Sequence, residues 1–157
     1  MVKLVDRDHK WATLIGRMFV SFGYIESCTY ECIEAFADSR VAKHLNNQSL
    51  SRRIEILKDL VEGIDSPQES RDQFIAILNE IKALSEKRNL IAHNPLVLHI
   101  FDSDVAGKPF AEKIISSKKP DKQIEFEELE VIASKSESLS GDLHKIMALL
   151  RLQGFST

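Results

Sequence analysis

The spacing of apolar residues near the N-terminus constrains the fold of this chain more than any other feature. Buried-type side chains recur there at alternating intervals of four and three residues, at Trp11, Ile15, Met18, Phe22, Ile25, Thr29, Cys32 and Phe36. This spacing places all of them on one side of an α-helix, as in bundles whose helices cross at shallow angles. The pattern therefore predicts one long helix over residues 7–37, with one face buried against other helices.

Small residues form a second stripe on the same segment, at Ala12, Gly16, Gly23 and Ser27. A glycine inside a helix costs about 1 kcal/mol relative to alanine. We therefore expect another helix to approach closely along this stripe, because close packing would offset that cost.

Two further helices are predicted from local signals. Asn46-Asn47 interrupts the chain, Ser49 or Ser51 suits the N-cap of a helix over about 51–62, and Gly63 suits its end. Ser66-Pro67-Gln68-Glu69 matches a capping box with proline at the first helical position. An apolar stripe then continues to Ile91, and Pro95 disfavours helix at the residue before it, which predicts a helix of about 27 residues.

After Pro95 the pattern of apolar residues changes from a helical one to a strand-like one. Leu96-Val97-Leu98-His99-Ile100-Phe101 and the segment 110–117 are strand-like, and Gly107-Lys108-Pro109 between them is typical of a turn. We expect a β-hairpin over about 96–117, followed by an exposed linker with Lys118, Lys119 and Lys122. A last helix over about 125–152 has glutamates in its first turn and basic residues near its end, which suits the helix dipole. The sum predicts one mainly α domain over residues 1–157, an up-and-down four-helix bundle with a β-hairpin inserted before the last helix.

Composition bounds the class of protein. The 157 residues are 43% hydrophobic and 29% charged, which suits one globular domain, and no apolar run approaches the ~20 residues of a membrane span. We expect a cytoplasmic protein. The net charge of −3 argues against a protein that coats nucleic acid, although it allows a nuclease with a local basic cleft. Cys28 and Cys32 are predicted to be reduced core residues, since no further cysteines complete a zinc site.

Reactive side chains concentrate in Arg88, Asn89 and His93, at the end of the third long helix. Arginine holds a phosphate with a bidentate fork, and histidine transfers protons near neutral pH. Together they suit a reaction at a phosphodiester that needs no metal ion or other cofactor. Asn89 and His93 share a helix face, but Arg88 lies about 140° from His93 around an ideal helix. Either the Arg88 side chain bends toward that face, or the residues meet across a two-fold axis.

Arg88-Asn89-Leu90-Ile91-Ala92-His93 resembles the signature of the HEPN superfamily, in which an arginine and a following polar residue precede a histidine near the end of a long helix. The predicted helix order resembles the HEPN bundle over most of the chain. Catalytic HEPN proteins are metal-independent ribonucleases that act as homodimers with facing motifs, and they serve as toxins and in antiviral defence. Leu96 departs from one toxin branch, where a tyrosine at that position is modified by the antitoxin, so that form of regulation is not implied.

The resemblance implies a hydrolase acting on RNA. In it, His93 would be the general base or acid, Arg88 would stabilise the scissile phosphate, and Asn89 would orient His93 or that phosphate. The resemblance also implies RNA as substrate and a homodimer, and it allows an antitoxin or another regulatory partner. Arg52, Arg53 and Lys58 are candidates for RNA binding beside the motif, and a solvated helix face is the alternative. The alternative for the whole chain is a non-catalytic helical module that binds a partner protein or a nucleotide.

Overall fold

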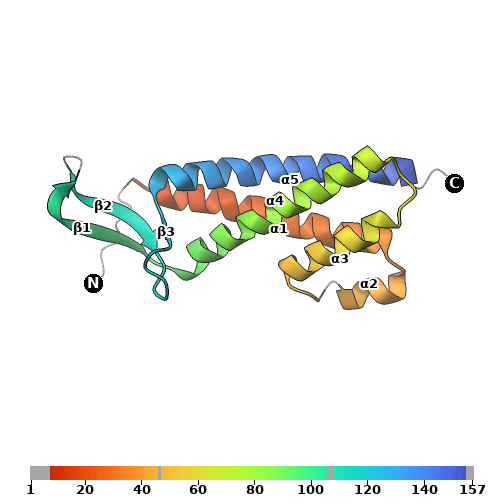
Figure 1. The fold of residues 1–157 in the computed structure, drawn as a ribbon, viewed down its shortest axis with the longest axis horizontal. Helices are drawn as coiled ribbons and strands as arrows, with labels where there is room; N and C mark the ends of the chain where they lie inside the picture. Colours follow the sequence, from red (N-terminus) through yellow and green to blue (C-terminus); the bar gives the residue numbers. More distant parts are fainter. Residues whose placement is uncertain (1–7, 46, 106–107, 155–157) are drawn as a thin grey trace.

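The computed structural model describes residues 8–45, 47–105 and 108–154. It confirms a mainly helical bundle with strands inserted before the last helix (Figure 1). Its helices are α1 (Lys10–Phe36), α2 (Ser39–Leu45), α3 (Leu50–Glu62), α4 (Gln68–His93) and α5 (Phe126–Gly154). Its strands are β1 (Leu96–Val105), β2 (Lys108–Ile115) and β3 (Gln123–Ile124). The short helix α2 and the strand β3 were not predicted, and Gly107 of the predicted turn lies outside the described residues.

The three long helices pack together and the sheet lies at one end of the bundle (Figure 1). Helices α1 and α5 run in the same direction, as shown by contacts that advance together along both of them: Trp11 with Phe126, Arg17 with Glu137, and Cys28 with Met147. Helix α4 runs in the opposite direction to α5, as shown by the ion pairs Glu80–Lys135 and Lys87–Glu128. The sheet thus returns the chain from the end of α4 to the start of α5.

The predicted apolar seam of α1 forms the centre of the core. Trp11, Met18 and Ile25 are fully buried, and Phe22 is 2% exposed. Burying one such side chain stabilises a fold by about 1.5–3 kcal/mol. Cys28 and Cys32 are buried free thiols, as expected. The hydrogen bond with Cys28 and burial both raise the pKa of the Cys32 thiol.

Helix boundaries follow the local signals with one exception. The Ser49 side chain accepts a hydrogen bond from the Arg52 backbone N–H, so Ser49 is the N-cap of α3. The capping box predicted for α4 is wrong. Pro67 occupies the cap position and no side chain caps the helix, while the Ser66 hydroxyl is buried without a hydrogen-bond partner among the described residues.

The close approach predicted along the small-residue stripe is also wrong. Gly16 and Gly23 are exposed, and a Cβ atom added to either one would meet nothing within 4 Å. The hydrogen bonds of α3 to α1 reach Glu26, Thr29 and Tyr30, in the C-terminal half of α1. The exposed side of α1 that holds both glycines therefore stays open.

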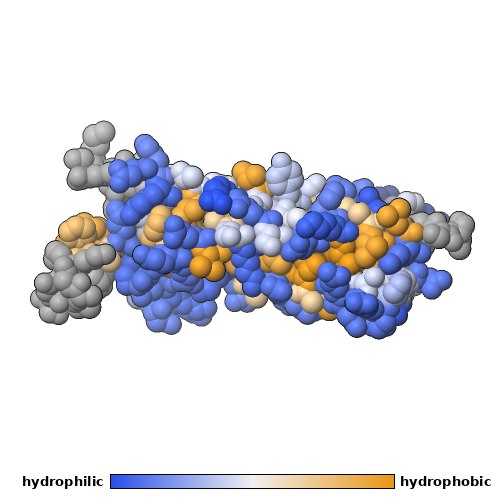
Figure 2. Space-filling view, turned by 90° about the horizontal axis from the view of Figure 1, so that it is seen from above, coloured by the Kyte–Doolittle hydropathy of each residue, from blue (hydrophilic) through white to orange (hydrophobic). Residues whose placement is uncertain are grey.

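Hydrophilic residues cover much of the face seen in Figure 2, and hydrophobic residues gather on it toward the end opposite the sheet. Near its C-terminal end, α5 exposes Leu149 and Leu152. None of the described helices is both long and apolar enough to cross a membrane.

Candidate functional site

Helix α4 ends at His93 because Asn94 takes an extended backbone conformation before Pro95 (φ −131°, ψ 147°). The motif therefore occupies the last two turns of α4. The structure brings Arg88 and His93 to the same end of one helix, but their side chains leave it in different directions. Arg88 packs toward α1, whereas His93 is exposed to solvent.

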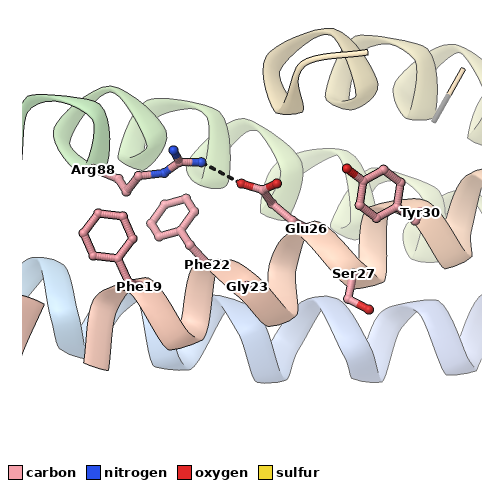
Figure 3. Close-up of a pocket in the computed structure, with 7 residues that line it drawn as sticks. All are labelled: Phe19, Phe22, Gly23, Glu26, Ser27, Tyr30 and Arg88. Atoms are coloured by element: carbon pink, nitrogen blue, oxygen red, sulfur yellow. Dashed lines mark hydrogen bonds and ion pairs between the residues drawn. The ribbon is translucent and has the colours of Figure 1, made fainter. Parts of the chain in front are cut away.

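Arg88 lies in an open groove beside α1, where a cavity has a volume of about 450 Å³. Its Nη2 donates a hydrogen bond of 2.7 Å to Oε1 of Glu26, and its guanidinium lies 5.2 Å from the centre of the Phe22 ring (Figure 3). The side chain is 20% exposed. The other residues that line the cavity all come from α1: Phe19, Phe22, Gly23, Glu26, Ser27 and Tyr30.

The Nε atom of Arg88 is buried and has no hydrogen-bond partner among the described residues. A buried donor without a partner costs about 1–3 kcal/mol. Glu26 accepts only from the Nη2 end of the guanidinium, so Nε is left without a partner among the described residues.

Asn89 and His93 share the exposed side of α4, as their spacing predicts. Neither side chain forms a hydrogen bond or an ion pair with another residue in the described part of the chain. Asn89 lines a second cavity of about 480 Å³, between α4 and the connection from β2 to β3. Within one chain, the arginine therefore faces one cavity and the asparagine another.

Asn94, one residue past the motif, joins α4 to the sheet. Its side chain donates a hydrogen bond of 2.8 Å to the Leu90 carbonyl and accepts one of 2.9 Å from the Ser117 backbone N–H. The sequence gives no sign of this contact, because the two ends of the second bond are 23 residues apart.

Arg53, predicted as a candidate for RNA binding, is buried in the structure, where it is only 2% exposed. Its guanidinium donates hydrogen bonds to Thr29, Tyr30 and the Gln48 carbonyl, and its Nη2 lies 3.4 Å from Oε2 of Glu26. Glu26 therefore bridges Arg53 and Arg88, two basic residues on different helices. Sequence reasoning missed Glu26, since its two arginine partners lie on α3 and α4.

The other two candidates on α3 are not buried. Lys58 is only 24% exposed and pairs with Glu55 at 3.4 Å. Glu55 also accepts a 2.8 Å hydrogen bond from Lys82, which is the main cause that lowers the pKa of this carboxyl. Arg52 is exposed at the start of α3. The three candidates therefore do not form one basic surface.

No group of three histidine, cysteine, aspartate or glutamate side chains suited to hold a metal ion occurs in the described ranges. The chain matches no protein-family model, no curated protein and no solved structure. The geometry of α4 and its surroundings is therefore the basis for any functional assignment.

Proposed function

We propose that the protein is a metal-independent endoribonuclease of the HEPN type, active as a homodimer. The observation that carries the proposal is the state of the motif side chains at the end of α4. Arg88 has a buried donor without a partner at the edge of an open cavity, and His93 five residues later is exposed and unpaired within the described chain.

The proposed chemistry uses the 2′-hydroxyl of the ribose as nucleophile. His93 takes the proton from that hydroxyl or gives a proton to the leaving 5′-oxygen. Arg88 stabilises the charge that develops on the scissile phosphate, and Asn89 orients His93 or the phosphate. The P–O bond to the 5′-oxygen breaks as the bond to the 2′-oxygen forms, which gives a 2′,3′-cyclic phosphate and a 5′-hydroxyl.

The directions of the side chains support the proposed homodimer. Arg88 packs toward α1 and faces away from the exposed His93 within one chain, so one chain does not bring the two side chains to the same phosphate. Two copies related by a two-fold axis, with the ends of α4 facing each other, would pair Arg88 of one chain with His93 of the other.

The first test is cleavage of a panel of single-stranded RNAs in EDTA by the unaltered protein, His93→Ala and His144→Ala. His144 is an exposed histidine of α5 and serves as the matched control. We expect cyclic phosphate ends from the unaltered protein, a loss of about 10²- to 10⁴-fold in rate for His93→Ala, and no change for His144→Ala. Equal rates for all three proteins would rule out His93 as catalyst. No cleavage of any RNA would favour the non-catalytic module.

The second test asks whether the site is shared between chains. Arg88→Ala and His93→Ala, each inactive alone, are mixed after separation and reassociation of the subunits. If one chain supplies the arginine and the other the histidine, about a quarter of the activity returns, because about half of the dimers are mixed and each has one intact site. No return of activity, with mixed dimers demonstrated, would place the whole site in one chain.

A further inference from the structure

The connection between β2 and β3 carries the most concentrated positive charge near the motif. Three lysines, Lys118, Lys119 and Lys122, occur there with a single acidic residue, Asp121. All three lysines are exposed, and none forms an ion pair with another described residue. This contrasts with the lysines of the bundle, of which Lys58, Lys82 and Lys87 are paired with glutamates.

Hydrogen bonds fix the shape of this connection. The Ser116 backbone N–H donates to the Lys122 carbonyl at 3.0 Å, and the Lys122 N–H donates to the Lys119 carbonyl at 2.8 Å. The Lys119 N–H donates to the Ser116 hydroxyl at 3.2 Å. The lysines are therefore presented by an ordered turn.

The same turn is attached to the end of the motif helix. Ser117 donates its backbone N–H to the Asn94 side chain, and Asn94 directly follows His93. Figure 1 shows the connection beside the C-terminal end of α4. The cavity of about 480 Å³ between them has Glu86, Lys87 and Asn89 of α4 in its lining, together with Asp121 and Lys122 of the connection and Gln123 of β3. This volume falls within the range of about 300–1,000 Å³ for small-molecule sites, so it can take the base of one nucleotide.

We infer that Lys118, Lys119 and Lys122 form the surface that binds the phosphates of single-stranded RNA, with one nucleotide in the cavity beside Asn89. This inference names the binding surface for the proposed ribonuclease and rests on that proposal for the identity of the ligand. Lysines bind phosphates as point charges, and free lysines bind them without first giving up a carboxylate partner. On a chain with a net charge of −3, this local positive surface directs an RNA strand toward His93.

The test measures RNA binding without cleavage, in His93→Ala protein, by fluorescence anisotropy of a labelled single-stranded RNA over a range of salt concentrations. One variant adds Lys118→Ala, Lys119→Ala and Lys122→Ala. The matched control adds Arg40→Ala, Lys43→Ala and Lys145→Ala, which remove the same charge from exposed residues of α2 and α5. Circular dichroism melting confirms that each protein is folded.

We call the protein without Lys118, Lys119 and Lys122 the loop variant. We expect its Kd for RNA to be at least about tenfold higher than that of the His93→Ala parent. The slope of log K against log salt concentration should be smaller in magnitude by about 2, since each single-strand phosphate contact contributes about 0.7. The control should change Kd less than about twofold if position matters more than net charge. An equal loss of affinity in both variants, an unchanged slope in the loop variant, or no RNA binding by the His93→Ala parent would overturn the inference.

Cleavage by the chain with His93 intact is measured separately, which keeps the two proposals distinguishable. RNA binding through the lysines without any cleavage would sustain the binding surface and refute the ribonuclease. RNA cleavage, with RNA binding unaffected by the substitutions at Lys118, Lys119 and Lys122, would sustain the ribonuclease and refute the binding surface.

Discussion

Replacing Arg53 with alanine tests whether this buried arginine supports the packing of α3 on α1. Arg53 is 2% exposed and donates to Thr29, Tyr30 and the Gln48 carbonyl, and its Nη2 is within 3.4 Å of Glu26. With this geometry, Arg53 supports the packing of α3 on α1 and has no access to RNA. Its loss should lower the free energy of unfolding and leave the RNA affinity of the folded protein unchanged.

The expected loss of unfolding free energy follows from the burial of the Arg53 side chain. Removing one partner of a buried ion pair costs about 3–5 kcal/mol. Glu26 is 35% exposed and keeps its hydrogen bond with Arg88, so the low end applies, about 3 kcal/mol. For a domain of this size each kcal/mol lowers Tm by about 2–4 °C, so Tm should fall by about 6–12 °C.

The assay is urea unfolding followed by circular dichroism, with Arg52→Ala as the control. Arg52 is the exposed neighbour of Arg53, and its side chain should contribute less than about 0.5 kcal/mol. Arg53→Met keeps the aliphatic part of the side chain and so separates lost packing from lost hydrogen bonds. A loss under about 1 kcal/mol for Arg53→Ala, or a similar loss for Arg52→Ala, would refute this account of the buried arginine.

Two further predictions concern α1. The hydrogen bond from Arg17 lowers the pKa of Glu137, so the pair stabilises the fold above the ordinary carboxyl pKa and loses this effect as pH falls through the lowered value. The stability difference between the unaltered protein and Glu137→Gln should be present at neutral pH and disappear in acid, and a pH-independent difference in urea midpoints would contradict it. Gly16→Ala and Gly23→Ala should each raise the free energy of unfolding by about 1 kcal/mol, since the added methyl group meets no neighbour. A loss of stability in either variant would reveal a close neighbour at that glycine.

Local features of the sequence were sufficient to predict the long helices, including α4, which carries the motif. The seam from Trp11 to Phe36 predicts α1, because its periodicity depends only on helix geometry. Pro95 predicts the end of α4, because a proline restricts the residue before it whatever the tertiary fold. The strand β3 was missed, because two residues are too few to show a period of two, although Ile124 is fully buried.

The surroundings of the residues near the candidate site could not be predicted in the same way. Helical periodicity places Arg53 away from the apolar face of α3, yet α1 supplies three partners for it from residues 23 to 27 positions away in sequence. The exposed linker of Lys118, Lys119 and Lys122 was predicted as such, but its position beside α4 depends on the bond between Asn94 and Ser117. The burial of Arg53 and the position of the lysines both depend on contacts between segments that are distant in sequence. The spacing of residues along the chain does not predict such contacts.

The distribution of paired and unpaired charges bears on how the proposed site would assemble. Glu26 contacts both Arg53 and Arg88, so the groove beside α1 holds an anion of the protein itself. Lys118, Lys119 and Lys122 form no ion pair with another described residue, and they lie in the connection that Asn94 ties to the end of α4. An RNA strand attracted by those lysines would meet His93 and Asn89 of that chain first, and Arg88 of the same chain would remain behind α4. The arginine for that phosphate would then come from the second copy, which is why the mixing of Arg88→Ala with His93→Ala is the most decisive of the proposed experiments.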